Sequence, residues 1–238
     1  MQWILFSFLT SLALPLQTRD SRDLRKLDDA LLEAARSGNL SGIEAALKKG
    51  AEPNARVLRP KTDSGEEEEV AADWNEEAGG TPIILAAAAG HTGAVERLLK
   101  AGAEIDAVDE RGWTALMRAA YFGKTDTVRM LIEAGAAVDA PEKYAGATAL
   151  HFAARQDHTE MVRILLEAGA NPNAALENGW TPLMWAVERG DVESVRLLLQ
   201  AGASPEATAM NGTSVRECAA RRGDPEILAL LAAAQTRD

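Results

Sequence analysis

Glycine recurs at an almost constant interval along most of this chain. One ladder has steps of 33, 34, 33 and 33 residues and comprises Gly79, Gly112, Gly146, Gly179 and Gly212. Two more ladders keep the same phase: Gly38, Gly90, Gly123, Asp157, Gly190 and Gly223, and Gly50, Gly102, Gly135, Gly169 and Gly202. A fixed period of this length indicates one supersecondary unit stacked repeatedly. The chain is therefore predicted to form a solenoid, which usually holds another protein on its surface and rarely encloses a catalytic cavity.

Each unit is predicted to begin with a short helix. A hydroxyl column recurs at Thr81, Thr114, Thr148, Thr181 and Ser214, and a hydroxyl at a helix start can accept a hydrogen bond from an amide of the first turn. Pro82 and Pro182 follow two of these residues, at a position where a missing N–H costs nothing. The helix is expected to end at the second ladder, in a left-handed conformation that glycine adopts readily. Asp157 is expected to share that conformation.

A second helix follows in each unit. Its apolar residues recur at i, i+3 and i+4, as in Val128, Leu131 and Ile132, so they lie on one helical face. An Ala-Gly-Ala triplet around the third ladder ends it. The first helix is rich in alanine, as at Ala119 and Ala120, which permits close approach between neighbouring units. The unit is therefore a turn followed by two helices.

These residues carry a family resemblance. The run Gly-Ala-Thr-Ala-Leu-His-Phe-Ala-Ala from Gly146, followed by Met161 to Ala174, closely resembles an ankyrin repeat. His151 holds the histidine of the family's Thr-Pro-Leu-His-x-Ala signature, which implies structural hydrogen bonds. The resemblance covers residues 27 to about 234. It implies an all-α ankyrin-repeat solenoid of helix-turn-helix units with β-turn fingers over residues 27–238, with six repeats that begin near Leu27, Gly79, Gly112, Gly146, Gly179 and Gly212. In the last repeat, Arg216 and Glu217 occupy columns that are otherwise apolar, as expected of a terminal cap.

The N-terminal segment lies outside the repeat pattern. The apolar run from Trp3 to Leu16 is shorter than the roughly 20 residues that span a bilayer, and residues 1–17 resemble a secretory signal peptide. Residues 18–26 are expected to be a linker. We therefore expect an exported protein, periplasmic or secreted, with no integral membrane span in its mature chain. A membrane anchor formed by the N-terminal segment is the alternative.

An acidic insertion, residues 56–78, separates the first two repeats. It contains four consecutive acids, Glu66 to Glu69, and like charges of this density favour a solvated loop. The alternative is an electrostatic arm that meets a basic partner.

The chemistry of the chain limits its possible functions. A formal net charge of −11 argues against nucleic acid and anionic membranes as partners, because phosphate would repel it. All three histidines fall in repeat columns, which argues against a catalytic triad or a metal site, and no nucleotide-binding or metalloprotease motif occurs. The single cysteine, Cys218, is expected to be a small buried hydrophobe. We predict a protein that is not an enzyme, has no cofactor or metal, and is monomeric.

The resemblance also places the partner site. It implies a concave face lined by residues around each turn glycine and by the two residues before each helix-ending position. These are Glu110, Arg111, Trp113, Tyr121, Phe122, Tyr144, Arg155, Gln156, Asn178, Trp180, Glu188 and Arg189, with Met210, Arg221 and Arg222 in the last repeat. Because Trp, Tyr and Arg are enriched in binding hot spots, we predict that this set contacts a partner protein. For Trp113 and Trp180, packing on the adjacent turn is the alternative.

The function predicted from these features is a non-enzymatic scaffold or adaptor that binds one partner protein. The alternative is an inhibitor or immunity-type protein that blocks a partner enzyme.

Overall fold

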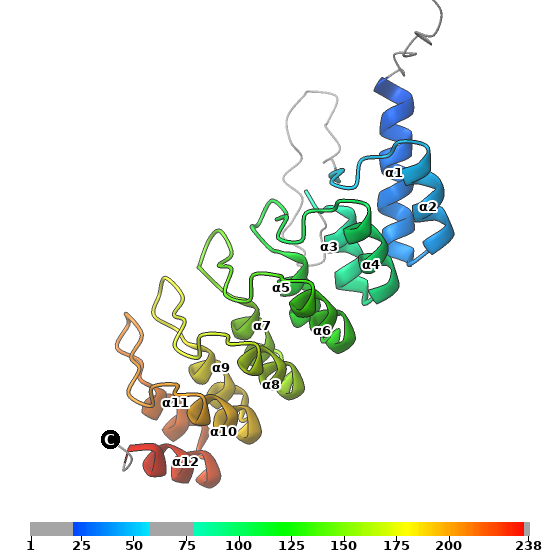
Figure 1. Cartoon of the computed structure of the whole chain (residues 1–238). Coiled ribbons are helices and arrows are strands. Elements are labelled where there is room, and N and C mark those ends of the chain that lie inside the picture. The colour runs from blue at the N-terminus through cyan, green and yellow to red at the C-terminus, as the bar shows by residue number, and fades with distance from the viewer. Residues whose placement is uncertain (1–20, 58–78, 236–238) are drawn as a thin grey trace, which may run out of the picture.

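The repeats form one elongated array of helix pairs (Figure 1). The structure is a computed structural model and describes residues 21–57 and 79–235. The inner helices are α1 (Ser21–Ser37), α3 (Pro82–Ala89), α5 (Ala115–Tyr121), α7 (Ala149–Arg155), α9 (Pro182–Arg189) and α11 (Val215–Arg222). The outer helices are α2 (Leu40–Lys48), α4 (Thr92–Lys100), α6 (Thr125–Glu133), α8 (Thr159–Glu167), α10 (Val192–Gln200) and α12 (Pro225–Gln235). The described residues form no strand, which confirms the predicted all-α class.

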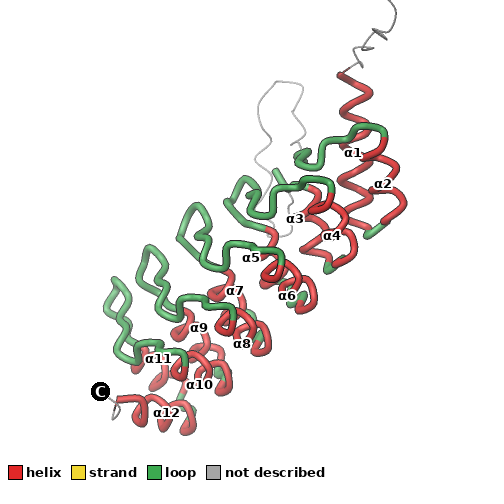
Figure 2. The backbone as a smooth tube through the Cα atoms, in the orientation of Figure 1, coloured by secondary structure: helices red, strands yellow, loops and turns green. Residues whose placement is uncertain are grey.

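The loops that join each outer helix to the next inner helix, called fingers below, project from one side of the array (Figure 2). Backbone hydrogen bonds link successive fingers: the amides of Lys143, Glu177 and Met210 donate to the carbonyls of Arg111, Ala145 and Asn178, at 3.2, 2.8 and 2.9 Å. The fingers of the later repeats therefore form a continuous edge, and the described parts of the fingers contain no regular strand.

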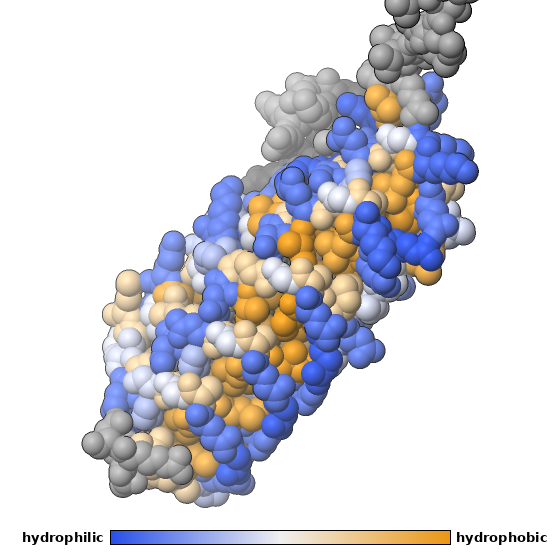
Figure 3. All heavy atoms as spheres, viewed as in Figure 1, coloured by the Kyte–Doolittle hydropathy of each residue, from blue (hydrophilic) through white to orange (hydrophobic). Residues whose placement is uncertain are grey.

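Alanine and branched apolar residues form a core that runs the length of the array. Ala86, Ala87, Ala119 and Ala120 on the inner helices are fully buried, as are Val95, Val128, Val162 and Val195 on the outer ones. Figure 3 shows apolar residues in a band along the array, bordered by hydrophilic side chains. Each helix pair packs against the next one, so burial is shared along the stack.

The hydroxyl column caps three inner helices as predicted. The Oγ atoms of Thr114, Thr181 and Ser214 accept from the amides of Met117, Met184 and Glu217, at 3.2, 3.4 and 3.2 Å. Thr81 and Thr148 occupy the same position without this bond. The cap prediction is therefore confirmed at three of the five positions.

The N-terminal end of the array differs from the expectation drawn from the sequence, and the C-terminal end agrees with it. Helix α1 begins at Ser21, so residues 21–26 are helical and do not form the expected linker; Leu24, Leu27 and Leu31 continue one helical face through them. At the other end, Arg216 and Glu217 are exposed while Cys218 is buried, as predicted for a cap. None of the described helices has the length and apolar character needed to cross a membrane.

Two predictions fall largely outside the described residues. The expected signal peptide, residues 1–17, lies wholly outside the described residues. Residues 58–78 of the acidic insertion also lie outside them. Export and the role of the insertion stay predictions.

Candidate functional site

The inner helices and the fingers together form a surface that we call the concave face. Of the twelve residues predicted to contact a partner, Glu110, Tyr144, Asn178 and Arg189 are exposed, and Arg111, Tyr121, Phe122, Arg155, Gln156, Trp180 and Glu188 are half-buried. Trp113 is the exception, because only 4 % of it is exposed.

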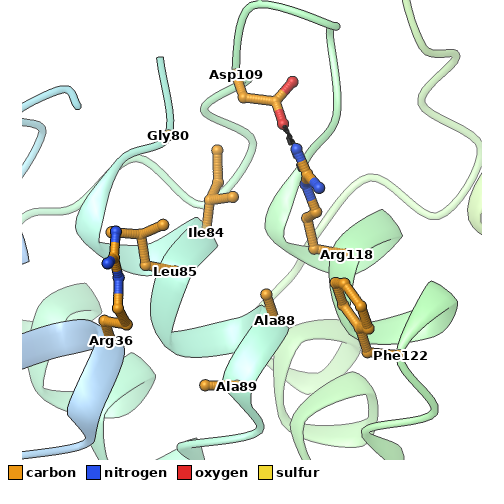
Figure 4. A pocket seen from close by; sticks show the side chains of 9 residues that line it. All are labelled: Arg36, Gly80, Ile84, Leu85, Ala88, Ala89, Asp109, Arg118 and Phe122. Carbon is orange, nitrogen blue, oxygen red and sulfur yellow. Dashed lines mark hydrogen bonds and ion pairs between the residues drawn. The ribbon is translucent and has the colours of Figure 1, made fainter. Parts of the chain in front are cut away.

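A hollow of about 230 Å³ opens between the inner helices of the first three repeats (Figure 4). It exists because Ala88 and Ala89 on α3 stand where the next repeat has Tyr121 and Phe122. The hollow is lined by Arg36, Gly80, Ile84, Leu85, Ala88, Ala89, Asp109, Arg118 and Phe122. Its walls are mainly apolar, with charged groups at two sides, so it suits an apolar side chain.

A buried ion pair closes one side of this hollow. The Arg118 guanidinium pairs with Asp109 through Nε, 3.1 Å from Oδ2, and through Nη2. The other carboxylate oxygen of Asp109 accepts from the amides of Arg111 and Trp113, both at 2.9 Å. This arrangement ties the finger to α5. Removing one partner of such a buried pair strongly destabilises the folded protein, because the other charge is then left buried and unpaired.

Trp113 packs within an aromatic cluster. Its ring centroid lies 4.1 Å from that of Phe152 and 5.4 Å from that of Tyr121, and the Arg118 guanidinium carbon lies 4.7 Å from its ring. The indole therefore offers almost no surface to a partner. These contacts support the alternative of turn packing for Trp113 over the predicted partner contact.

Trp180 is more accessible and pairs with Trp185. The two ring centroids lie 4.7 Å apart, and the Arg155 guanidinium carbon lies 5.0 Å from the Trp185 ring. Both indoles are half-buried. The concave face thus keeps accessible aromatic surface in the fifth repeat.

Carbonyls in the last turn of four inner helices accept hydrogen bonds from the following repeat. His91 Nε2 lies 3.1 Å from the Arg36 carbonyl, and His158 Nε2 lies 3.1 Å from the Tyr121 carbonyl. In the later repeats arginine takes this role. Arg189 Nε donates to the Arg155 carbonyl at 2.5 Å, and Arg222 Nη1 donates to the Glu188 carbonyl at 3.4 Å. The two arginine cations also meet the negative pole of the helix whose carbonyl they bind.

His151 makes the structural hydrogen bonds that the resemblance implies. Its Nδ1 accepts from the Thr148 amide at 3.2 Å, and its Nε2 lies 3.4 Å from the Trp180 carbonyl in the next repeat. Burial lowers the pKa of His151 to about 4. The imidazole is therefore neutral at physiological pH, and with Nδ1 accepting, Nε2 carries the proton and donates.

Asp109 is the residue of this site that the sequence did not reveal. Its signal is indirect: Arg118 stands in a column that holds Leu85, Phe152 and Trp185 in other repeats. A charge in a buried column needs a partner, and the adjoining finger supplies one in the carboxylate of Asp109.

Comparison with known proteins agrees with the repeat architecture. A family model described as ankyrin repeats (3 copies) matches residues 62–142, 137–209 and 175–237, which together cover more than half of the chain. No curated protein matches the sequence.

Proposed function

This chain belongs to the ankyrin repeat family, and on that premise we propose that it is a non-enzymatic scaffold or adaptor that binds a partner protein on its concave face. Ankyrin repeats are generally modules of protein–protein interaction, and stacked repeats create extended concave surfaces for that purpose.

The observation that supports this proposal most directly is the hollow beside Phe122. It is formed by inner helices of neighbouring repeats, and its lining is largely apolar. Ile84 and Leu85 are already buried by stacking, whereas Ala88, Ala89 and Phe122 still expose apolar surface around the hollow. A partner side chain that enters the hollow would bury this apolar surface, which favours association.

Filling the hollow should abolish binding. Ala88 is half-buried at the end of α3, so Ala88→Trp occupies the space with little change to the core. We expect at least a tenfold loss of the protein captured in a crosslinking pull-down. Ala45→Trp, at an exposed position on outer helix α2, is the matched control and should capture as the unaltered chain does. Both variants should keep the thermal unfolding midpoint.

Equal capture by both variants would exclude the hollow as the place where the partner binds. If the captured partner is an enzyme, its turnover with and without the chain distinguishes a scaffold from an inhibitor.

We also propose that the protein is exported, on the basis of the apolar run in residues 1–17. Amino-terminal sequencing of the mature protein tests this: an intact Met1 would contradict cleavage of a signal peptide.

A further inference from the structure

We propose that Asn211 is a site of spontaneous deamidation, and that its counterpart Asn178 is protected by the finger that follows it. The reaction converts an asparagine into aspartate or isoaspartate and needs only water. This inference goes beyond the proposed function and does not depend on it, because it concerns the chemistry of the chain itself.

Two asparagines of this chain are followed by glycine, in the pairs Asn178-Gly179 and Asn211-Gly212. A glycine carries no Cβ, so its backbone nitrogen can approach the side chain of the residue before it. This nitrogen and the asparagine Cγ close a small ring when they join, and groups held together in this way react much faster than separate molecules do. Both pairs therefore have a sequence that favours deamidation.

The reaction proceeds through a cyclic imide. The glycine N–H loses its proton to a base in the solvent, and the nitrogen forms a bond to the asparagine Cγ. The bond between Cγ and Nδ2 then breaks, and ammonia leaves after taking a proton from water. Water next opens the imide: attack at Cγ gives aspartate, and attack at the main-chain carbonyl carbon gives isoaspartate, whose main chain runs through the former side chain. Each ammonia released is balanced by one water consumed.

The two pairs have almost the same local geometry. Asn178 Oδ1 accepts from the Trp180 amide at 3.1 Å, and Asn211 Oδ1 accepts from the Thr213 amide at 3.0 Å. Each donor lies at the oxygen on which negative charge develops during attack at Cγ, so it stabilises that charge. Each glycine amide donates to the carbonyl three residues earlier, at 2.7 and 2.9 Å, and this bond must break first. Local geometry therefore does not distinguish the two sites.

The following finger does distinguish them. The Asn178 carbonyl accepts from the Met210 amide of that finger at 2.9 Å. A Cβ built on Gly179 would lie 2.9 Å from the Cα atom of Ala209, so the neighbouring backbone covers this peptide. Ring closure turns the peptide between asparagine and glycine toward the side chain. At Asn178 that movement would break the contact with Met210.

Asn211 stands on the last finger of the described residues (Figure 2). Asn211 and Gly212 are both exposed. A Cβ built on Gly212 would meet no atom of another residue within 4 Å, so no finger in the described ranges covers this peptide. The peptide can turn without breaking a contact with a further repeat, and we expect Asn211 to react faster than Asn178.

The products change the last finger. Isoaspartate adds a methylene to the main chain inside the turn that is closed by the bond from the Ala209 amide to the Thr213 carbonyl, at 2.9 Å. Both products also place a negative charge beside Met210, whose side chain is 83 % exposed. A finger that carries one of the predicted partner contacts is therefore altered with time, without an enzyme.

Peptide mapping of the full chain measures both rates in one sample. The folded chain is incubated at mildly alkaline pH, and aliquots are digested with trypsin. Because trypsin cuts after arginine and lysine, Asn178 and Asn211 fall in separate peptides, residues 164–189 and 197–216. We expect Asn211 to be converted at least tenfold faster than Asn178, with isoaspartate among the products. The rate should rise with pH, because the attacking nitrogen must lose its proton.

The same chain in concentrated urea is the matched control. Unfolding removes the cover of the following finger, so Asn178 should approach the rate of Asn211 there. Asn211→Gln, whose longer side chain would have to close a larger ring, should leave peptide 197–216 unconverted.

Three outcomes would overturn the inference. The first is a folded chain in which Asn178 reacts as fast as Asn211, or in which neither site reacts while both react in urea. The second is a tenfold difference that persists in urea, which would assign the effect to neighbouring side chains and not to the fold. The third is aspartate without isoaspartate, which would exclude the imide.

Discussion

At the scale of single residues, Asp157 shows how the array admits an exception. Among the described residues it is the one non-glycine with positive φ, at 57°, as the ladder predicted. A Cβ at Gly38, Gly90 or Gly123 would lie within 3 Å of the long side chain at His91, Lys124 or His158 in the next repeat. The counterpart facing Asp157 is Asp191, which is shorter and is engaged by Ser194. Asp157 itself is exposed, and its left-handed backbone conformation is a cost that glycine would not have.

Asp157→Gly should raise the urea midpoint of unfolding. A left-handed conformation costs an ordinary residue about 1–2 kcal/mol, and aspartate less, while glycine loses more chain entropy on folding. We expect a net gain below about 1 kcal/mol, measured by circular dichroism. Asp157→Ala, which keeps the Cβ and loses the polar group, should lower the midpoint. A lower midpoint for the glycine variant would contradict this account.

His151 should make stability depend on pH. Its pKa is about 4 in the folded chain, against an ordinary value of 6.5. Between these values the unfolded chain binds a proton that the folded chain does not, so the free energy of unfolding falls as pH falls from about 6.5 to 4. The loss approaches about 3 kcal/mol at the lower end.

A methionine variant isolates this effect. Met117 Sδ accepts from the Thr114 amide at 3.5 Å, the role that His151 has for Thr148, so His151→Met should fold. Urea unfolding at several pH values should show a flatter dependence between pH 6.5 and 4 for the variant. Parallel curves for the two proteins would show that His151 is not the titrating group.

At the scale of elements, the outer helices are joined by a chain of alternating charges. Successive ion pairs run through Arg129, Glu160, Arg163, Glu193, Arg196 and Glu226, at 2.7, 3.3, 3.1, 3.2 and 2.7 Å. These side chains are 39–58 % exposed, and exposed pairs contribute about 0–1 kcal/mol each. The chain of pairs therefore adds modestly to cohesion between repeats and occupies arginines of the outer face.

Local signals in the sequence were enough to predict the helix pairs of the repeats. Glycine at a helix end and threonine at a helix start act within a few residues, so their spacing gives the helix pairs directly. The direction of a side chain was less accessible. Trp113 is buried because its ring packs on Phe152, which comes from the next repeat. The position of Trp113 within the repeat pattern does not by itself indicate the direction of the indole. Asp109 escaped notice for the same reason, since its partner Arg118 lies on another element.

At the scale of the whole molecule, each helix pair is held by its neighbours alone. Inner helices contact adjacent inner helices, and outer helices contact adjacent outer ones, along the entire array. A terminal repeat therefore has one stabilising interface where an internal repeat has two. Such an array is expected to open from its ends at lower free energy than it unfolds as a whole.

Cys218 can report this opening. The thiol is fully buried on α11, and burial raises its pKa while the hydrogen bond from Arg221 partly opposes that shift. Reaction with a disulfide reagent such as Ellman's reagent therefore requires the last repeat to open. Ile227, buried on α12, holds this repeat closed. Ile227→Ala removes buried methylenes at a cost of about 2–5 kcal/mol, so the labelling rate in native buffer should rise at least tenfold.

The matched control is Leu98→Ala on α4, an equally buried site in the second repeat. It should lower the thermal midpoint and leave the labelling rate of Cys218 almost unchanged, because four repeat boundaries separate the two sites and opening of the end does not break the contacts of Leu98. Equal acceleration by both variants would mean that the thiol is reached only by global unfolding. The array would then behave as a single cooperative unit, and its ends would not open before the whole.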